Sequence, residues 1–155
     1  MDMDTQMKRK FYTVEEANQT LPLVRVIVSD IVTLYRDVHE RRERLARIRQ
    51  IPGTENRDEE NIYSDEVEEI EKEQEKDILR LESYVEELKE LGVVLKDAVV
   101  GLIDFWTVID GREAHLCWKL GEEEIGFWHE LDAGFQGRQS LLERAAPRNE
   151  STEEL

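Results

Sequence analysis

Two long stretches of helical periodicity, residues 22–49 and 63–91, place the strongest constraint on how this chain folds. In both stretches apolar residues recur at alternating steps of three and four, which is typical of an amphipathic helix with one buried face. The predicted buried face of the first stretch contains Val24, Ile27, Val28, Ile31, Leu34, Tyr35, Val38, Leu45 and Ile48, and that of the second contains Tyr63, Val67, Ile70, Gln74, Ile78, Leu81, Val85 and Leu88. The first face narrows toward the C-terminal end of its helix, and the second face widens toward the C-terminal end of its helix. The two helices are therefore predicted to form an antiparallel hairpin with a thin tip.

The residues around these stretches indicate where the helices begin and end. Thr13 and Glu16 have the spacing of a capping box, which predicts a helix beginning directly after Thr13. A proline inside a helix costs about 3 kcal/mol, so Pro22 is predicted to separate a short helix at 14–20 from a long helix that Pro22 itself begins. Gly92 is predicted to end the last helix in a left-handed conformation.

Charges of opposite sign are concentrated in the two halves of the predicted hairpin. Arginines crowd the end of the first long stretch, and acidic residues crowd the start of the second, so these segments would lie side by side. We therefore interpret the run RRERLARIR as the partner of an acidic helix rather than as a nucleic-acid site. The chain carries a net charge of −16, which repels phosphate backbones and anionic membranes. Neither nucleic acid nor a membrane is expected as a partner.

From Gly92 onward the pattern changes from helical to extended. Runs typical of strands occur at 93–95, 102–109, 115–120 and 125–131. Asp110-Gly111 predicts a two-residue hairpin turn between the second and third runs. The sequence therefore predicts an α+β fold, in which a long antiparallel helical hairpin packs on a small antiparallel β-meander.

One domain is expected over residues 11–142. The helical hairpin would occupy 11–91, and the meander with a Gly-Arg loop would occupy 92–142. Residues 1–10 and 143–155 are predicted to be disordered.

The two-residue turn fixes a strand register that can be worked out from the sequence. It pairs Trp106 with His115 and Asp104 with Cys117, and it places these four on one face of the sheet. The opposite face, which carries Ile103, Phe105, Leu116 and Trp118, is predicted to be the core. The next turn leaves two alternatives. A four-residue loop would put Trp128 beside Cys117 and Glu130 beside His115, and a five-residue loop would put His129 beside Cys117.

With the five-residue loop, Asp104, His115, Cys117 and His129 would share one face of the sheet. Imidazole, thiolate and carboxylate groups are ligands of zinc and similar divalent ions, so these four residues are the candidate metal ligands. The alternative is that the histidines are hydrogen-bonded residues at a sheet surface and that Cys117 fills space in the packing.

Three further residues are candidates for contact with a cofactor or small ligand. Arg138 lies in a Gly-Phe-Gln-Gly-Arg loop and could clamp a carboxylate or phosphate. Trp106 and Trp128 would share a face with polar groups, which suits a ligand pocket. The alternatives are an Arg138 paired with a local carboxylate, and tryptophans that pack in the core or at an interface.

Composition favours a cytoplasmic protein. A single cysteine excludes an intrachain disulfide, and the N-terminal segment lacks the apolar run of a signal peptide. The first expected function is a non-enzymatic interaction module that self-associates, with a dimer favoured, and binds an unidentified protein partner. The second is a metal- or small-ligand-binding domain, with hydrolysis as the reaction class that its His, Cys and Asp residues would support.

Several segments together resemble a known family. The segments YTVEEANQTLP, LGVVLKD, GLIDF and DGREAHLCWKLGEEEIGFWHELDAGFQGR are similar to a bacterial family designated domain of unknown function 2203. The resemblance covers about Phe11 to Leu141. It implies a small cytosolic bacterial protein and brings no activity, cofactor or catalytic residue with it.

Overall fold

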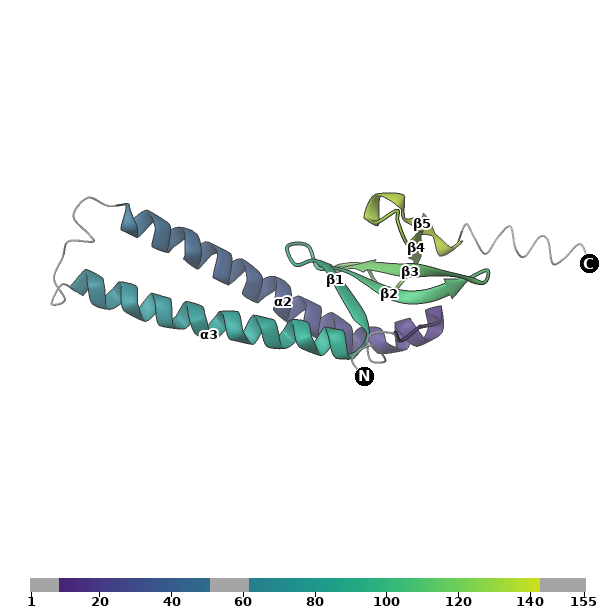
Figure 1. The fold of residues 1–155 in the computed structure, drawn as a ribbon, viewed down its shortest axis with the longest axis horizontal. Helices are drawn as coiled ribbons and strands as arrows, with labels where there is room; N and C mark the ends of the chain where they lie inside the picture. Colours follow the sequence, from purple (N-terminus) through teal and green to yellow (C-terminus); the bar gives the residue numbers. More distant parts are fainter. Residues whose placement is uncertain (1–8, 51–61, 143–155) are drawn as a thin grey trace, which may run out of the picture.

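The protein has an α+β fold in which a sheet lies against one end of a helical arm (Figure 1). The computed structural model describes residues 9–50 and 62–142. The arm consists of α2 (Val14–Arg49) and α3 (Ile62–Glu90), and the sheet of β1 (Val93–Asp97), β2 (Leu102–Ile109), β3 (Arg112–Lys119), β4 (Phe127–Glu130) and β5 (Gln139–Ser140), with a short helix η1 (Phe135–Gly137) before β5. This architecture confirms the predicted helical hairpin on an antiparallel meander. Apart from Arg9 and Lys10, the ends that were predicted to be disordered fall outside the described residues.

Helix α2 is continuous through Pro22, so the predicted break at this residue is wrong. The capping box is present as predicted: the Thr13 hydroxyl accepts from the Glu16 backbone, and the Glu16 carboxylate accepts from the Thr13 backbone. The buried stripe includes Leu21 and Val24 and so runs past Pro22, which lies on the exposed side. Each fully buried aliphatic side chain contributes about 1.5–3 kcal/mol, and several of them together outweigh the cost of one proline.

The arm is held together by an apolar seam that is interrupted by polar contacts around Gln74, with Leu45 buried beyond them. Gln74 is buried, and its side-chain amide donates to the carbonyl of Val38 on α2. Arg41 donates to both Gln74 and Asp77, at 2.8 and 3.0 Å, and Arg80 also contacts Asp77. The arginine-rich end of α2 therefore pairs with the acidic helix, as predicted. No helix among the described residues is long and apolar enough to cross a membrane.

Replacement of Arg41 should weaken the arm, because Asp77 is largely buried and would lose its closest cation. We expect Arg41→Ala to lower the free energy of unfolding by about 2 kcal/mol, less than for a fully buried pair because Arg80 still contacts Asp77. Urea denaturation measures this change. Arg44→Ala, at an exposed position one turn away, is the control and should cost less than about 0.5 kcal/mol. Equal losses in the two variants would contradict the assignment.

The sheet is a meander in which every strand pairs with the next along the chain, in the order β1-β2-β3-β4-β5. Asp110 and Gly111 both have positive φ, as the predicted two-residue turn requires. The predicted pairs Trp106 with His115 and Asp104 with Cys117 are both present. The predicted core face is also correct, since Ile103, Phe105, Leu116 and Trp118 are fully buried against the helices.

The connection from β3 to β4 differs from both predicted alternatives. His129 pairs with His115, and Phe127 pairs with Cys117, so the loop occupies residues 120–126. Ile125 in this loop is buried in the core, and its backbone N–H donates to the Asn18 side chain at 2.8 Å. The loop is long because it carries a core residue. It nevertheless leaves His129 on the same face as His115, as the five-residue alternative had required.

Tyr12 joins the arm to the sheet at a single buried residue. Its backbone N–H donates to the carbonyl of Trp106 at 2.8 Å, and its own carbonyl accepts from the Thr107 hydroxyl at 2.6 Å. Its phenol hydroxyl donates to the carbonyl of Leu91, just after α3. Tyr12 therefore links the segment before α2, the end of α3 and the middle of β2.

Candidate metal centre

A buried cluster of polar side chains lies on the face of the sheet opposite the apolar core. It consists of Asp104 from β2, Cys117 from β3 and His129 from β4. Side chains alternate along a strand, so the register of the meander places all three on the same face. Each is no more than 2% exposed. Burial of polar groups is costly unless they are satisfied, so the cluster needs a physical explanation.

The three side chains are close enough to share one ion. One ligand atom from each, an aspartate oxygen, the cysteine sulfur and a histidine nitrogen, lies within 4.8 Å of the other two. Bonds of about 2.0–2.3 Å to a tetrahedral zinc would separate such atoms by roughly 3.3–3.8 Å. The Nε2 atom of His129 and the Oδ2 atom of Asp104 are already 3.1 Å apart. A small side-chain adjustment would therefore bring the three into coordination geometry.

The hydrogen bonds of His129 fix which of its nitrogens carries a proton. Nδ1 lies 2.8 Å from the backbone carbonyl of Glu130, and a carbonyl can only accept, so Nδ1 must be the donor. In the neutral imidazole the lone pair of Nε2 then faces Asp104. A lone pair and a carboxylate oxygen 3.1 Å apart need a cation between them, either a proton or a metal ion.

His115 borders the cluster without being part of the three-atom group. Its Nδ1 is 3.5 Å from Oδ2 of Asp104, and its ring meets the ring of His129 edge-on at 5.2 Å. Burial lowers the pKa of His115, and the neighbouring His129, Lys96 and Arg9 lower it further, although Asp104 opposes them. The neutral form of the His115 ring is therefore favoured. Within the described residues, neither ring nitrogen of His115 forms a hydrogen bond, and Oδ1 of Asp104 accepts none.

The environment of Cys117 keeps its thiol protonated. Burial is the main cause, and together with the neighbouring Asp104 carboxylate it raises the pKa of Cys117 to about 12. Such a thiol is unreactive at neutral pH unless a metal ion displaces its proton. The site is therefore suited to a metal thiolate and unsuited to a free nucleophile.

Side chains from the segment before α2 pack on Trp106, which itself packs on His115. Trp106 packs edge-on against His115, with ring centroids 4.4 Å apart. The guanidinium of Arg9 lies 4.1 Å from the Trp106 ring centroid, and the Phe11 ring contacts the same indole at 6.2 Å. The segment before α2 thus lies over the indole that borders the histidine pair.

The three residues predicted to contact a cofactor do not converge. Trp128 pairs with Leu116 and is buried in the core, so the prediction that it shares a face with Trp106 is wrong and the alternative of core packing is confirmed for it. The different β3–β4 register causes this change. Arg138 forms a 3.0 Å ion pair with Glu122 and lies 3.9 Å from the ring centroid of Phe127. Its charge is therefore already matched, and it holds the Gly-Arg loop against the sheet.

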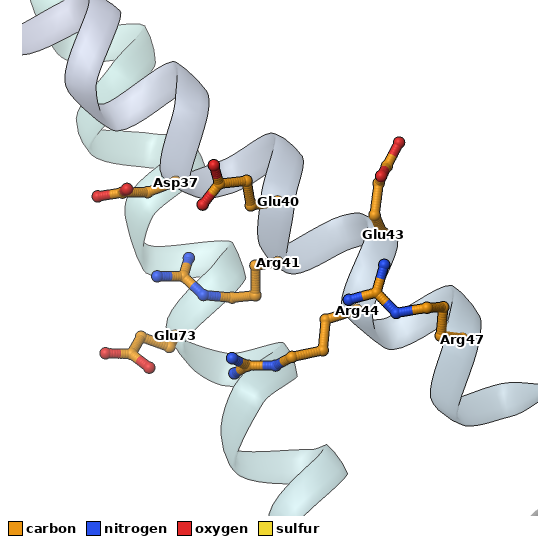
Figure 2. A pocket seen from close by; sticks show the side chains of 7 residues that line it. All are labelled: Asp37, Glu40, Arg41, Glu43, Arg44, Arg47 and Glu73. Carbon is orange, nitrogen blue, oxygen red and sulfur yellow. The ribbon is translucent and has the colours of Figure 1, made fainter.

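A hollow of about 430 Å³ lies on the arm, and its lining differs in character from the buried cluster. Figure 2 shows that arginines from α2 alternate with acidic side chains around it; the lining residues are Asp37, Glu40, Arg41, Glu43, Arg44, Arg47 and Glu73. Four carboxylates and three guanidinium groups leave no surplus of positive charge for an anion. This hollow is best explained as a solvated surface of mixed charge beside the Arg41–Asp77 ion pair.

Sequence analysis missed the group that orients the cluster, because that group is a backbone carbonyl. The carbonyl of Glu130 selects the tautomer of His129, and any residue at that position could supply it. Proximity of His129 and Glu130 in the sequence gave only a weak signal. The separation of His115 from the other three candidate ligands was equally hidden, because it depends on side-chain direction within a strand pair.

Comparison with known proteins places the whole described fold in one family. A family model described as an uncharacterized conserved protein, DUF2203, matches residues 10–141. Searches of curated proteins and of solved structures gave no match. The matched region contains α2, α3, all five strands and the three clustered side chains. The chain therefore belongs to the DUF2203 family.

Proposed function

We propose that this protein binds a divalent transition-metal ion, with zinc as the best fit, through Asp104, Cys117 and His129. The observation that carries the proposal is the orientation of His129. Its Nδ1 donates to a backbone carbonyl, and its Nε2 points at a carboxylate 3.1 Å away. Histidines that bind metals commonly donate their second nitrogen in this way, which fixes the ring and increases its basicity.

The chemistry of the three donors narrows the choice of ion. One nitrogen, one sulfur and one oxygen match zinc or a neighbouring transition metal, whereas magnesium and calcium prefer sites made of oxygen atoms alone. Loss of the Cys117 proton on binding would give the site two negative charges, which would neutralise a divalent ion. A free thiol of this kind is maintained in a reducing compartment, so we place the protein in the cytoplasm.

Burial favours a structural or regulatory ion over a catalytic one. Catalytic zinc keeps an open coordination position that substrate can reach, whereas all three ligands here are nearly inaccessible to solvent. We assign the fourth position to a water molecule or to His115, whose ring nitrogens form no hydrogen bond within the described residues. In this role the ion would join three neighbouring strands of the meander.

Metal analysis of untagged protein tests this proposal. Protein exposed to zinc and then dialysed against metal-free buffer should retain about one zinc per chain, measured by inductively coupled plasma mass spectrometry. Asp104→Asn, Cys117→Ser and His129→Asn should each lose it. Cobalt-substituted protein should show thiolate-to-cobalt charge-transfer absorption, and this absorption should be absent in Cys117→Ser.

A matched control is available in His39→Asn. His39 is exposed on the arm, where it contacts Glu43 and Tyr35, so its replacement should leave the zinc content unchanged. Parent protein that retains no zinc would contradict the proposal. So would zinc retained equally by all three site variants, because the acidic surface would then be the binding site.

A further inference from the structure

An apolar groove lies in the corner between the arm and the sheet. It has a volume of about 710 Å³, and its lining includes Ile31, Tyr35, Leu81, Val85, Val93 and Leu95. These residues belong to α2, α3 and β1, so strand β1 forms one wall and the arm forms the other. The volume lies within the range of clefts that bind small molecules and peptide segments.

The wall formed by β1 is a free strand edge. Ile109 and Arg112 flank a two-residue turn and form a hydrogen-bonded pair, so odd-numbered residues of β2 bond to β3 and even-numbered ones face β1. The Trp106 carbonyl, which accepts from Tyr12 on that side, follows the same rule. In β1 it is therefore Val94, opposite Asp104, that bonds to β2.

Val93 and Leu95, which line the groove, consequently direct their backbone N–H and carbonyl groups away from β2. No hydrogen bond involving these groups occurs within the described residues outside the β1–β2 ladder. An edge with unpaired backbone groups is a template for another strand. The opposite edge of the sheet is β5, which is only two residues long and therefore offers fewer backbone groups to an added strand.

We propose that an extended peptide segment of a partner protein binds in this groove as a sixth strand paired with β1. The backbone groups of Val93 and Leu95 would supply hydrogen bonds, and the apolar side chains of the arm would take every second side chain of the segment. This mode of recognition needs both a free edge and an apolar wall, and both are present here. The proposal does not rest on the metal site, which lies among β2, β3 and β4.

The charges that line the groove indicate which kind of peptide segment would bind there. Glu82 and Glu86 line the groove together with Lys89, and the whole chain carries a charge of −16. A segment that is apolar at alternate positions and carries basic residues would therefore be attracted at long range and would complement the groove.

A second copy of this chain fits the groove less well than a single segment. Figure 1 shows the arm extending beside β1, so a second sheet that paired edge to edge would bring its own arm against the first. The C-terminal half of α3 is acidic in both copies, and the two surfaces would repel each other. An extended segment carries no such arm.

The test uses a synthetic probe, the fluorescein-labelled heptapeptide Lys-Val-Thr-Val-Thr-Val-Lys, with full-length protein. Fluorescence anisotropy should show saturable binding, and amide chemical-shift changes should centre on Val93 and Leu95. A peptide with the same lysines and glycine in place of valine should bind at least about tenfold more weakly. N-methylation of alternate amides of the probe should have a similar effect, because it removes backbone donors.

Variants of α3 provide the matched comparison. Val85→Trp places a bulky ring in the groove, and it should weaken probe binding by about tenfold or more. Leu79→Trp, at a position on the same helix that is 66% exposed, should not. Shift changes in the parent protein remain informative even if Val85→Trp folds poorly. Equal binding of the glycine or N-methylated probe, or a dimer whose interface includes β1, would overturn the proposal.

Discussion

Zinc should raise the melting temperature of this protein by about 5–10 °C. A ligand that binds only the folded state, at a free concentration of 100 times its dissociation constant, adds about 2.7 kcal/mol to the free energy of unfolding. In a domain of this size each kilocalorie shifts the melting temperature by about 2–4 °C. Binding should be specific to the folded state because Asp104, Cys117 and His129 come together only when three strands pair. Differential scanning calorimetry of metal-free protein with and without zinc measures the shift.

Variants and a second ion separate this effect from weak binding to the acidic surface. His129→Asn and Cys117→Ser should each lose the zinc-dependent shift, and His39→Asn should retain it. Magnesium at the same concentration should give little change, because a thiolate is a poor ligand for it. A full zinc shift in His129→Asn would contradict the assignment of the site.

Gly101→Ala should destabilise the protein by about 2–4 kcal/mol. Gly101 has a φ of +76°, which costs a residue with a Cβ about 1 kcal/mol or more. The added carbon would lie 2.8 Å from Cβ of Leu120 and 3.0 Å from Cγ1 of Val28, so it would also overpack the contact between the β1–β2 turn and α2. Overpacking of this kind costs about 1–3 kcal/mol. Urea denaturation monitored by tryptophan fluorescence measures the total.

Gly111→Ala is the matched control for this substitution. Gly111 has a similar φ of +79°, but nothing lies within 4 Å of the carbon that alanine would add. Its replacement should therefore lower the free energy of unfolding only by the cost of the positive φ, about 1–2 kcal/mol. If the two variants lost the same stability, the close packing around Gly101 would not contribute to the fold.

Sequence reasoning succeeded where the structure is determined locally. The pairing of Asp104 with Cys117 followed from the Asp110-Gly111 turn, because a two-residue turn allows only one register. The capping box at Thr13 and the left-handed Gly92 at the end of the arm followed from local chemistry in the same way.

The sequence-based predictions were wrong where a contact between distant parts of the chain determines the local structure. Continuity of α2 through Pro22 depends on burial of Leu21 and Val24 against a sheet formed about 70 or more residues later in the chain. The register of β4 depends on Ile125, which is held in the core and bonded to Asn18. That register then decided which face Trp128 occupies. The groove along β1 was likewise invisible, because it depends on which element lies beside a strand edge.

The hydrogen bonds of Tyr12 have a geometric consequence for the arm. One residue binds the middle of β2 through its backbone and the end of α3 through its side chain, so it connects the sheet to the arm at a fixed position. The angle between the arm and the sheet at this connection should determine the distance between the two walls of the groove. The width of a surface formed by α3 and β1 is thus controlled by a residue that belongs to neither, and it precedes the first turn of helix in the arm.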